Sequence, residues 1–168
     1  INGLDTISNQ PIEIDNLILI CNGEIYNYQE LFNRLGVEPI TNSDCEVIIH
    51  CYKKYGIEYT LQMLDGVFAF VLIDNNTNKL FVGRDPYGVR PIYYFTNTDN
   101  VWVFGSELKQ ISNFINSKND LVSQFLPSSY SVFNLKDEIW TFDYNTKYIT
   151  NFIQPIINRN DNEMLSNI

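Results

Sequence analysis

Residues 17–20 form a short unbroken apolar run, Leu-Ile-Leu-Ile, that passes directly into the polar segment CNGEIYN at residues 21–27. The aliphatic and β-branched side chains of the run predict a strand that is buried on both faces. A buried strand that gives way at once to an amide, a glycine and a carboxylate indicates that its end is used for binding or catalysis. This junction therefore constrains both the fold and the position of a site.

Asn22, Gly23 and Glu24 carry the chemistry of this junction. Asn22 offers a side-chain amide donor, and Gly23 lets another chain or a ligand approach its backbone N–H because it has no Cβ. Two such donors aimed at one oxygen would form an oxyanion hole, which stabilises charge on a carbonyl oxygen during acyl transfer. Glu24 would accept hydrogen bonds from a cation such as an ammonium group. The alternative is structural: Asn-Gly makes a tight turn and Glu24 caps the following helix.

The charge of the chain argues against nucleic acid as a partner. It has 20 Asp and Glu residues against 11 Lys and Arg, a formal charge of −9, whereas phosphate binding depends on clustered basic side chains. No apolar run approaches the roughly 20 residues of a membrane span, and no signal-peptide pattern opens the chain. With 168 residues, 45% of them apolar, the chain predicts one soluble domain with a substantial core.

Cys21, Cys45 and Cys51 are an odd number of cysteines without the spacing of a disulfide framework. This pattern predicts reduced thiols and a cytoplasmic protein. Cys21 follows a buried run, where burial raises the pKa of a thiol, so we do not expect it to be a nucleophile. His50 is the only histidine and lacks the partners of a metal site, so we expect no metal and assign structural roles to His50, Cys45 and Cys51.

The periodicity of the remaining chain predicts an α+β fold. Helical spacing of apolar residues predicts helices over residues 28–35, with a C-terminal cap at Gly36, around 47–52, with Ser43 or Asp44 as N-cap, and over 58–64. Apolar runs predict a central strand at 67–73, strands at 79–82, 92–95 and 101–104 that continue the same sheet as hairpins, and a peripheral hairpin within 141–150. Strands and helices in separate blocks, without β-α-β alternation, are typical of α+β layers.

The segment NGEIYN at residues 22–27 resembles the glutamine-site motif of class II glutamine amidotransferase domains, specifically those of asparagine synthetases. Further segments extend the resemblance in the same order: NQPI at 9–12, SDCEVI at 43–48, LDGVFAF at 64–70, GRDPYGVRP at 83–91 and GSE at 105–107. Each segment alone is a weak signal. Their common order and spacing make a strong one.

The resemblance implies the N-terminal-nucleophile (Ntn) hydrolase fold, a four-layer αββα sandwich of two antiparallel sheets. It implies an amidotransferase domain over residues 1–150 and a linker over 151–168 toward a synthetase domain absent from this chain. In this family an N-terminal cysteine attacks the side-chain amide of glutamine, with its own α-amine as the base. The ammonia released travels to the synthetase domain, which makes asparagine from aspartate with ATP and magnesium. The amidotransferase domain itself uses no cofactor.

The resemblance assigns roles to four residues of this chain. Asn22 and Gly23 match the oxyanion-hole donors, and Glu24 and Asp44 match the acids that accept the α-ammonium of glutamine. An aspartate at the rim of a pocket can cap a helix with one oxygen and bind a ligand with the other. We therefore expect Asp44 to have both roles.

Ile1 and Asn2 match the end of a run whose backbone groups line the substrate pocket in this family; the alternative is a frayed terminal strand. The family's nucleophilic cysteine, and the arginine that holds the α-carboxylate of glutamine, would precede Ile1 and are absent here. We therefore expect that the chain is an N-terminally truncated fragment that binds glutamine weakly and does not hydrolyse it.

Three other segments carry weaker expectations. The GRDPYG loop should be structural and support the pocket, with Arg84 and Asp85 pairing with each other or with neighbours. The Ser-Glu pair at residues 106–107 is a family hallmark or a cap for the helix that follows. At residues 127–130 the family shows a Pro-Gly-x-Tyr turn, and here Ser128 replaces the glycine.

Two alternative functions remain open. One is another class II amidotransferase, which forms an amino sugar or phosphoribosylamine; the other is an inactive domain kept for binding or oligomerisation. The EIYN and SDCE segments favour asparagine synthetase. The expected partners are glutamine, the synthetase domain of the same chain and a second copy in a possible homodimer of the full-length protein; we expect neither nucleic acid nor a membrane.

Overall fold

The computed structural model describes residues 6–118 and 120–150, and these residues form two antiparallel sheets. The large sheet has six strands in the order β1-β2-β3-β4-β8-β9. Their bounds are β1 (Ile12–Ile14), β2 (Leu17–Ile25), β3 (Gly66–Asp74), β4 (Lys79–Arg84), β8 (Ser129–Lys136) and β9 (Ile139–Lys147). The predicted central strand is therefore β3. The peripheral hairpin predicted within 141–150 is wrong, because residues 141–147 belong to the single edge strand β9, which forms its hairpin with β8.

The small sheet has three strands in the order β6-β5-β7, which are β5 (Tyr93–Thr96), β6 (Trp102–Gly105) and β7 (Leu121–Gln124). The prediction that the strands near residues 92–95 and 101–104 continue the first sheet is wrong, because they pair with each other and with β7 in a sheet of their own. Alternation of apolar residues identifies a strand but says nothing about its partner strand. The predicted fold class, an α+β arrangement of two antiparallel sheets, is confirmed.

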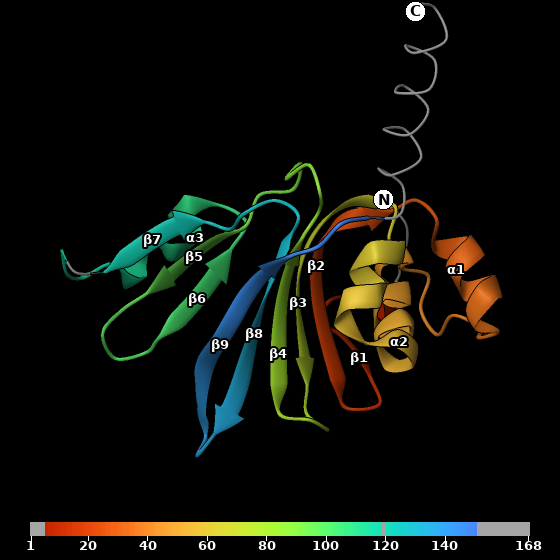
Figure 1. The fold of residues 1–168 in the computed structure, drawn as a ribbon, viewed down its shortest axis with the longest axis horizontal. Helices are drawn as coiled ribbons and strands as arrows, with labels where there is room; N and C mark the ends of the chain where they lie inside the picture. The colour runs from red at the N-terminus through yellow and green to blue at the C-terminus, as the bar shows by residue number, and fades with distance from the viewer. Residues whose placement is uncertain (1–5, 119, 151–168) are drawn as a thin grey trace, which may run out of the picture.

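The helices lie mainly on one side of the large sheet. Figure 1 shows the large sheet between the small sheet on one side and α1 (Tyr28–Leu35) and α2 (Val47–Met63) on the other. The short helix α3 (Leu108–Ile111) packs against β5 and β6. Single 3-10 turns complete the described elements: η1 (Thr6–Ser8), η2 (Asp44–Glu46) and η3 (Ser112–Phe114). None of the described helices is long and apolar enough to cross a membrane.

Strand β2 is longer than the sequence predicts, and it is not buried on both faces. It continues through Asn22, Gly23 and Glu24, in unbroken register with β3 from Leu17 opposite Asp74 to Ile25 opposite Gly66. Ile20 is 55% exposed, so the two faces of the strand alternate between buried and accessible residues. Pairing with β3 supplies the backbone hydrogen bonds that keep these polar residues in a strand. The alternative in which Asn-Gly forms a turn is therefore wrong.

The helices α1 and α2 follow the predicted boundaries closely. Gly36 ends α1 in the left-handed conformation, with φ of 70°, and its N–H donates to the Phe32 and Asn33 carbonyls. Helix α2 is interrupted at Gly56, whose φ of 76° and ψ of 173° are not helical. The short helix predicted at 58–64 is thus the second part of α2.

Two apolar cores hold the layers together. The larger core packs α1 and α2 against β1, β2, β3, β4 and β8. The smaller core lies between the sheets and contains Ala69, Leu80, Val82, Ile92, Phe125 and Phe133. Burial of these side chains supplies most of the favourable free energy of folding. It fixes β3, β4 and β8 between the helices on one face and the small sheet on the other.

Candidate active site

The edge of β2 that faces away from β3 organises the site. Cys21 donates its backbone N–H to Gln10 Oε1 at 2.6 Å, and its carbonyl accepts from Gln10 Nε2 at 2.7 Å. Four residues along the strand, the Ile25 N–H donates to Asp44 Oδ2 at 2.6 Å. Backbone groups point alternately to the two sides of a strand, so the N–H of Gly23 faces the same edge as those of Cys21 and Ile25.

This edge is only partly covered by the neighbouring strand. Among the described residues, β1 pairs with Leu17, Ile18 and Leu19 and no further along β2. Beyond β1, the Gln10 side chain makes with the Cys21 backbone the two hydrogen bonds that a paired strand residue would make. Gly23 therefore lies between two side-chain contacts to the strand edge, at Cys21 and at Ile25.

The Asn22 side chain lies on the face of β2 that is turned toward the small sheet. It lines a pocket of about 250 Å³ whose wall includes Ile20, Pro91, Ser106 and Gln110. Asn22 presents its amide on the face of the strand and Gly23 presents its N–H at the edge. The oxyanion-hole hypothesis requires both donors to reach one carbonyl oxygen at the corner between this face and this edge, and it stays a prediction.

Asp44 approaches β2 from the turn η2. The expectation that Asp44 caps the second helix is wrong: Ser43 occupies the N-cap position of η2 without a side-chain capping bond, and Glu46 precedes α2. The Asp44 carboxylate turns instead toward the edge of β2. There it accepts from the Ile25 N–H, which β1 does not reach. This contact joins Asp44 to the strand one residue from Glu24.

Neither Glu24 nor Asp44 forms an ion pair with a cationic side chain in the described part of the chain. The ion pairs there are His50–Glu46, Lys53–Asp15 and Lys109–Glu107. Asp44 is only 4% exposed, and a buried carboxylate without a positive partner carries a large desolvation cost. Glu24 shares the Asn22 face of β2, about 6.6 Å further along the strand. An ammonium bound between Glu24 and Asp44 would compensate both charges.

Four of the six predicted site residues are thus brought together on one short stretch of β2 and the turn beside it. Asn22, Gly23 and Glu24 are consecutive in the strand, and Asp44 reaches them through the Ile25 N–H. The other two, Ile1 and Asn2, lie outside the described residues, as does the predicted linker over 151–168.

Sequence reasoning missed two residues that hold this stretch in place. Gln10 closes the ladder at Cys21, as described above. Asn27 bridges β2 to the turn before β3, because its Nδ2 donates to the Met63 carbonyl at 2.9 Å and its Oδ1 accepts from the Asp65 N–H at 3.0 Å. Both residues belong to segments that resemble the amidotransferase family, and that was the only signal for them in the sequence.

The loop after β4 supports β3 opposite Gly23, as expected for a structural loop. Asp85 is fully buried, and its carboxylate accepts from the N–H groups of Phe68, Tyr87, Val89 and Arg90. Arg84 donates to the carbonyls of Gly88, Arg90 and Phe125. The two side chains therefore pair with neighbouring backbone groups, one of the two arrangements that the sequence left open.

Ser128 preserves the turn in which it replaces the family's glycine. Its φ of 54° is in the left-handed region, which a residue with a Cβ enters at some cost. The Ser128 hydroxyl donates to the Tyr148 carbonyl at 2.6 Å, and the Ser128 N–H donates to the Asp85 carbonyl at 3.0 Å. These contacts, the first of which glycine lacks, hold the turn against the buried loop.

Glu107 is the N-cap of α3 and forms a capping box with Gln110. The capping role expected for the Ser-Glu pair is therefore confirmed. Ser106 and Gln110 also line the pocket that Asn22 faces. The cap thus fixes one wall of the pocket opposite β2.

The three cysteines are buried, and two of them have raised pKa values. Contact with Cys45, followed by burial, raises the pKa of the Cys21 thiol well above its ordinary value, and burial raises the pKa of Cys51 to about 12. Cys45 is 3% exposed. The expectation that Cys21 is not an activated nucleophile agrees with this environment.

Thiol-labelling rates provide a test of this environment. At pH 8, Cys51 should hold roughly a thousandth of the thiolate of an ordinary cysteine. We expect all three native thiols to react with a disulfide reagent at least about 100-fold more slowly than the same thiols in urea. Rapid labelling of one thiol in the native protein, located by mass spectrometry, would contradict this expectation.

Comparison with known protein families gives a match along almost the whole chain. The model of the glutamine amidotransferase domain family matches residues 1–162. The chain is 45% identical over 132 residues to the glutamine-hydrolysing asparagine synthetase of Mesocricetus auratus and 43% identical to that of Homo sapiens. Each alignment covers 76% of this chain and 24% of the relative, so the chain spans about a quarter of the length of these relatives.

Solved structures with a similar fold include other amidotransferases. Glutamine phosphoribosylpyrophosphate amidotransferase from B. subtilis matches with a TM-score of 0.69 at 25% identity, over 88% of this chain and 33% of that one. A second structure, described as the allosteric regulatory enzyme of purine biosynthesis, matches with a TM-score of 0.66 at 26% identity, over 84% of this chain and 31% of that one. The arrangement of two antiparallel sheets is therefore shared with glutamine amidotransferases of the Ntn-hydrolase type.

Proposed function

This chain belongs to the glutamine amidotransferase domain family, and on that premise we propose that it is the glutaminase domain of a glutamine-hydrolysing asparagine synthetase. The full-length protein would hydrolyse glutamine and pass the ammonia to a synthetase domain, which would convert aspartate to asparagine with ATP and magnesium. The proposal also includes a cytoplasmic location.

The observation that carries the proposal is the hydrogen bond between the Ile25 N–H and Asp44. It joins a buried acid without a cationic partner to the strand that holds Asn22, Gly23 and Glu24. An oxyanion hole and an ammonium site then lie at the two ends of one stretch about as long as an extended glutamine side chain.

The proposed chemistry divides the work between these residues. A thiolate attacks the amide carbon of glutamine, and the carbonyl oxygen takes up negative charge that the Asn22 amide and the Gly23 N–H stabilise. The carbon–nitrogen bond breaks, the protonated nitrogen leaves as ammonia, and water later hydrolyses the thioester to glutamate. Glu24 and Asp44 bind the α-ammonium throughout, so they orient the substrate without taking part in bond changes.

The nucleophile in this proposal is a cysteine that precedes Ile1. Cys21, Cys45 and Cys51 are buried, and the thiols of Cys21 and Cys51 have raised pKa values. Buried thiols lack the accessible thiolate that acyl transfer requires. We propose accordingly that the 168-residue chain by itself does not turn over glutamine.

A second class II amidotransferase reaction is the main rival. The fold match to a phosphoribosylpyrophosphate amidotransferase fits this alternative. The identity of 45% with asparagine synthetases, against 25% with that enzyme, favours the asparagine synthetase assignment. A catalytically inactive domain would have no need to keep Asp44 buried at the edge of β2 without an ion-pair partner.

Glutamate production measures the proposed activity directly. The gene should encode Met-Cys upstream of residue 1, and the full-length protein should form glutamate from glutamine and asparagine from aspartate in the presence of ATP. The 168-residue chain and a full-length variant with the N-terminal cysteine replaced by alanine should form no glutamate. Glutamate release coupled to phosphoribosylamine or amino-sugar formation would assign the rival reaction, and its complete absence in the full-length protein would contradict the proposal.

A further inference from the structure

Glu46 is a fully buried carboxylate with four hydrogen-bond partners. It accepts from the Ile40 N–H at 2.7 Å, the Thr41 N–H at 2.5 Å, the Thr41 hydroxyl at 2.6 Å and His50 Nε2 at 2.9 Å. A carboxylate has about four acceptor positions, so its capacity is filled. Burial opposes ionisation, but the hydrogen bonds from Ile40, Thr41 and His50 outweigh it and hold the pKa of Glu46 below its ordinary value.

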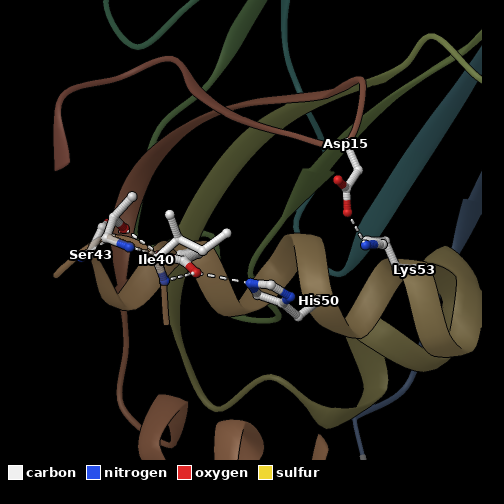
Figure 2. Close-up of polar contacts among 7 residues, drawn as sticks. Asp15, Ile40, Ser43, His50 and Lys53 are labelled. Atoms are coloured by element: carbon white, nitrogen blue, oxygen red, sulfur yellow. Dashed lines mark hydrogen bonds and ion pairs between the residues drawn. The ribbon is translucent and has the colours of Figure 1, made fainter. Parts of the chain in front are cut away.

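These bonds fix the segment that leads directly into Asp44. The Thr41 hydroxyl, held by Glu46, accepts from the Ser43 N–H at 3.2 Å. The Glu46 N–H donates to the Ser43 carbonyl at 3.2 Å. Both backbone groups of Ser43 are therefore held by Glu46 or by a group bound to it, and Ser43 is the residue before Asp44. Figure 2 labels Ile40, Ser43 and His50 around this network.

His50 holds Glu46 from the next turn of α2. It lies four residues along the helix from Glu46, and its ring also makes an edge contact with Phe32 of α1, with ring centroids 5.6 Å apart. The histidine side chain is only 11% exposed. The single histidine of the chain thus braces the carboxylate between the two helices.

We propose that Glu46, braced by His50, is a positioning residue for Asp44 and thereby sets the affinity of the site for the ammonium end of glutamine. This role rests on the proposed function, in which Asp44 binds that ammonium. Glu46 does not touch the substrate; it acts by holding the backbone of the preceding loop so that the Asp44 carboxylate reaches the Ile25 N–H.

The variant Glu46→Gln tests the proposal because it keeps the size of the side chain and removes its charge. Whichever oxygen it replaces, the glutamine NH2 would face a backbone N–H, of Ile40 or of Thr41, which can only donate. The loop over residues 40–43 must then move, and Asp44 with it. In the full-length protein we expect the KM for glutamine to rise about tenfold, as a displaced binding group loses affinity. The kcat should change much less, and ammonia-dependent asparagine synthesis should be unaffected, because the lost contact serves the ground state and the transition state alike.

Asp74→Asn is the matched control. Asp74 is 4% exposed and also accepts four hydrogen bonds, from Tyr52, Asn76 and two groups of Thr77. It lies opposite Leu17, at the far end of β2 from Ile25. We expect Asp74→Asn to lower the melting temperature as Glu46→Gln does while leaving the KM for glutamine unchanged.

Amide hydrogen exchange in the 168-residue chain provides a readout that does not depend on activity. The protection factor of the Ile25 amide, which donates to Asp44, should fall at least about tenfold in Glu46→Gln. The Cys21 amide, which donates to Gln10, should keep its protection, and Asp74→Asn should change neither. If Glu46→Gln does not fold, His50→Leu should shift the Ile25 exchange and the KM in the same directions by smaller amounts.

Wild-type KM and wild-type Ile25 exchange in a folded Glu46→Gln protein would overturn the positioning role. Equal effects of Asp74→Asn would also overturn it, because the changes would then reflect general destabilisation. If the wild-type full-length protein does not hydrolyse glutamine, the proposed function fails, and the Ile25 amide alone decides whether Glu46 positions Asp44.

Discussion

Replacing Asn22 with alanine in the full-length protein should lower the rate of glutamine hydrolysis by roughly 100-fold or more. The Asn22 amide faces the pocket between β2 and the small sheet and is proposed to donate to the oxyanion, whose charge develops only in the transition state. Loss of such a donor lowers kcat rather than substrate affinity. Ammonia-dependent asparagine synthesis does not use this step, so it should remain close to the wild-type rate.

Asn134→Ala is the control for this experiment. Asn134 is an amide on β8 of the same large sheet, and its side chain donates to Asp143 on β9 rather than to the pocket. It should leave both activities unchanged. A parallel loss of glutamine-dependent and ammonia-dependent synthesis in Asn22→Ala would indicate misfolding, and full glutaminase activity would remove Asn22 from the oxyanion hole.

Gly23→Ala should destabilise the protein by about 3 kcal/mol or more, and it should abolish glutaminase activity. An added Cβ would lie 2.4 Å from the Val67 carbonyl oxygen and 2.7 Å from the Phe68 Cα. Both are backbone atoms of β3, so no side chain can rotate away to make room. Strands β2 and β3 would have to separate at the point where the proposed oxyanion donor is placed.

Gly36→Ala separates this steric effect from ordinary glycine strain. Gly36 has φ of 70° but no atom within 4 Å of its added Cβ, so its substitution should cost only about 1–2 kcal/mol. Urea unfolding of both variants measures the difference. If the urea midpoint of Gly23→Ala is at or above that of Gly36→Ala, β3 can move away from the added Cβ at little cost. The steric argument would then fail.

The role of Gly23 illustrates what the residues alone could not reveal. The sequence left open whether the missing Cβ admits another chain or a ligand, and the close atoms in the structure belong to the neighbouring strand β3. Gly66 repeats the pattern from the other strand, since its added Cβ would lie 2.3 Å from the Glu24 carbonyl oxygen. Close approach of a ligand and close approach of a neighbouring strand both require glycine at a position. Only the structure, which shows the paired strands, distinguishes the two explanations.

The helices and most strands were predictable because their signals are local. Apolar spacing and Gly36 placed α1, and the apolar runs placed β3 and β4. The predicted end of β2 was wrong because a run of polar residues usually marks the end of a strand. Here the polar residues stay in the strand because they pair with β3. The assignment of β5 and β6 to a separate sheet was missed because partner choice depends on residues far apart in the chain.

The sequence by itself determined the family, the four residues proposed for the site and where the helices begin, because motif order and short-range periodicity depend on neighbouring positions. The tertiary structure alone decided that Asp44 binds the β2 edge instead of capping a helix. It also decided that Gln10 and Asn27 hold the same strand, and that Glu46 and His50 form the hydrogen-bonded network next to Asp44. These contacts join residues that are up to 38 positions apart. They form because burial leaves polar groups with no water to bind, so each must find its partner wherever the fold brings one.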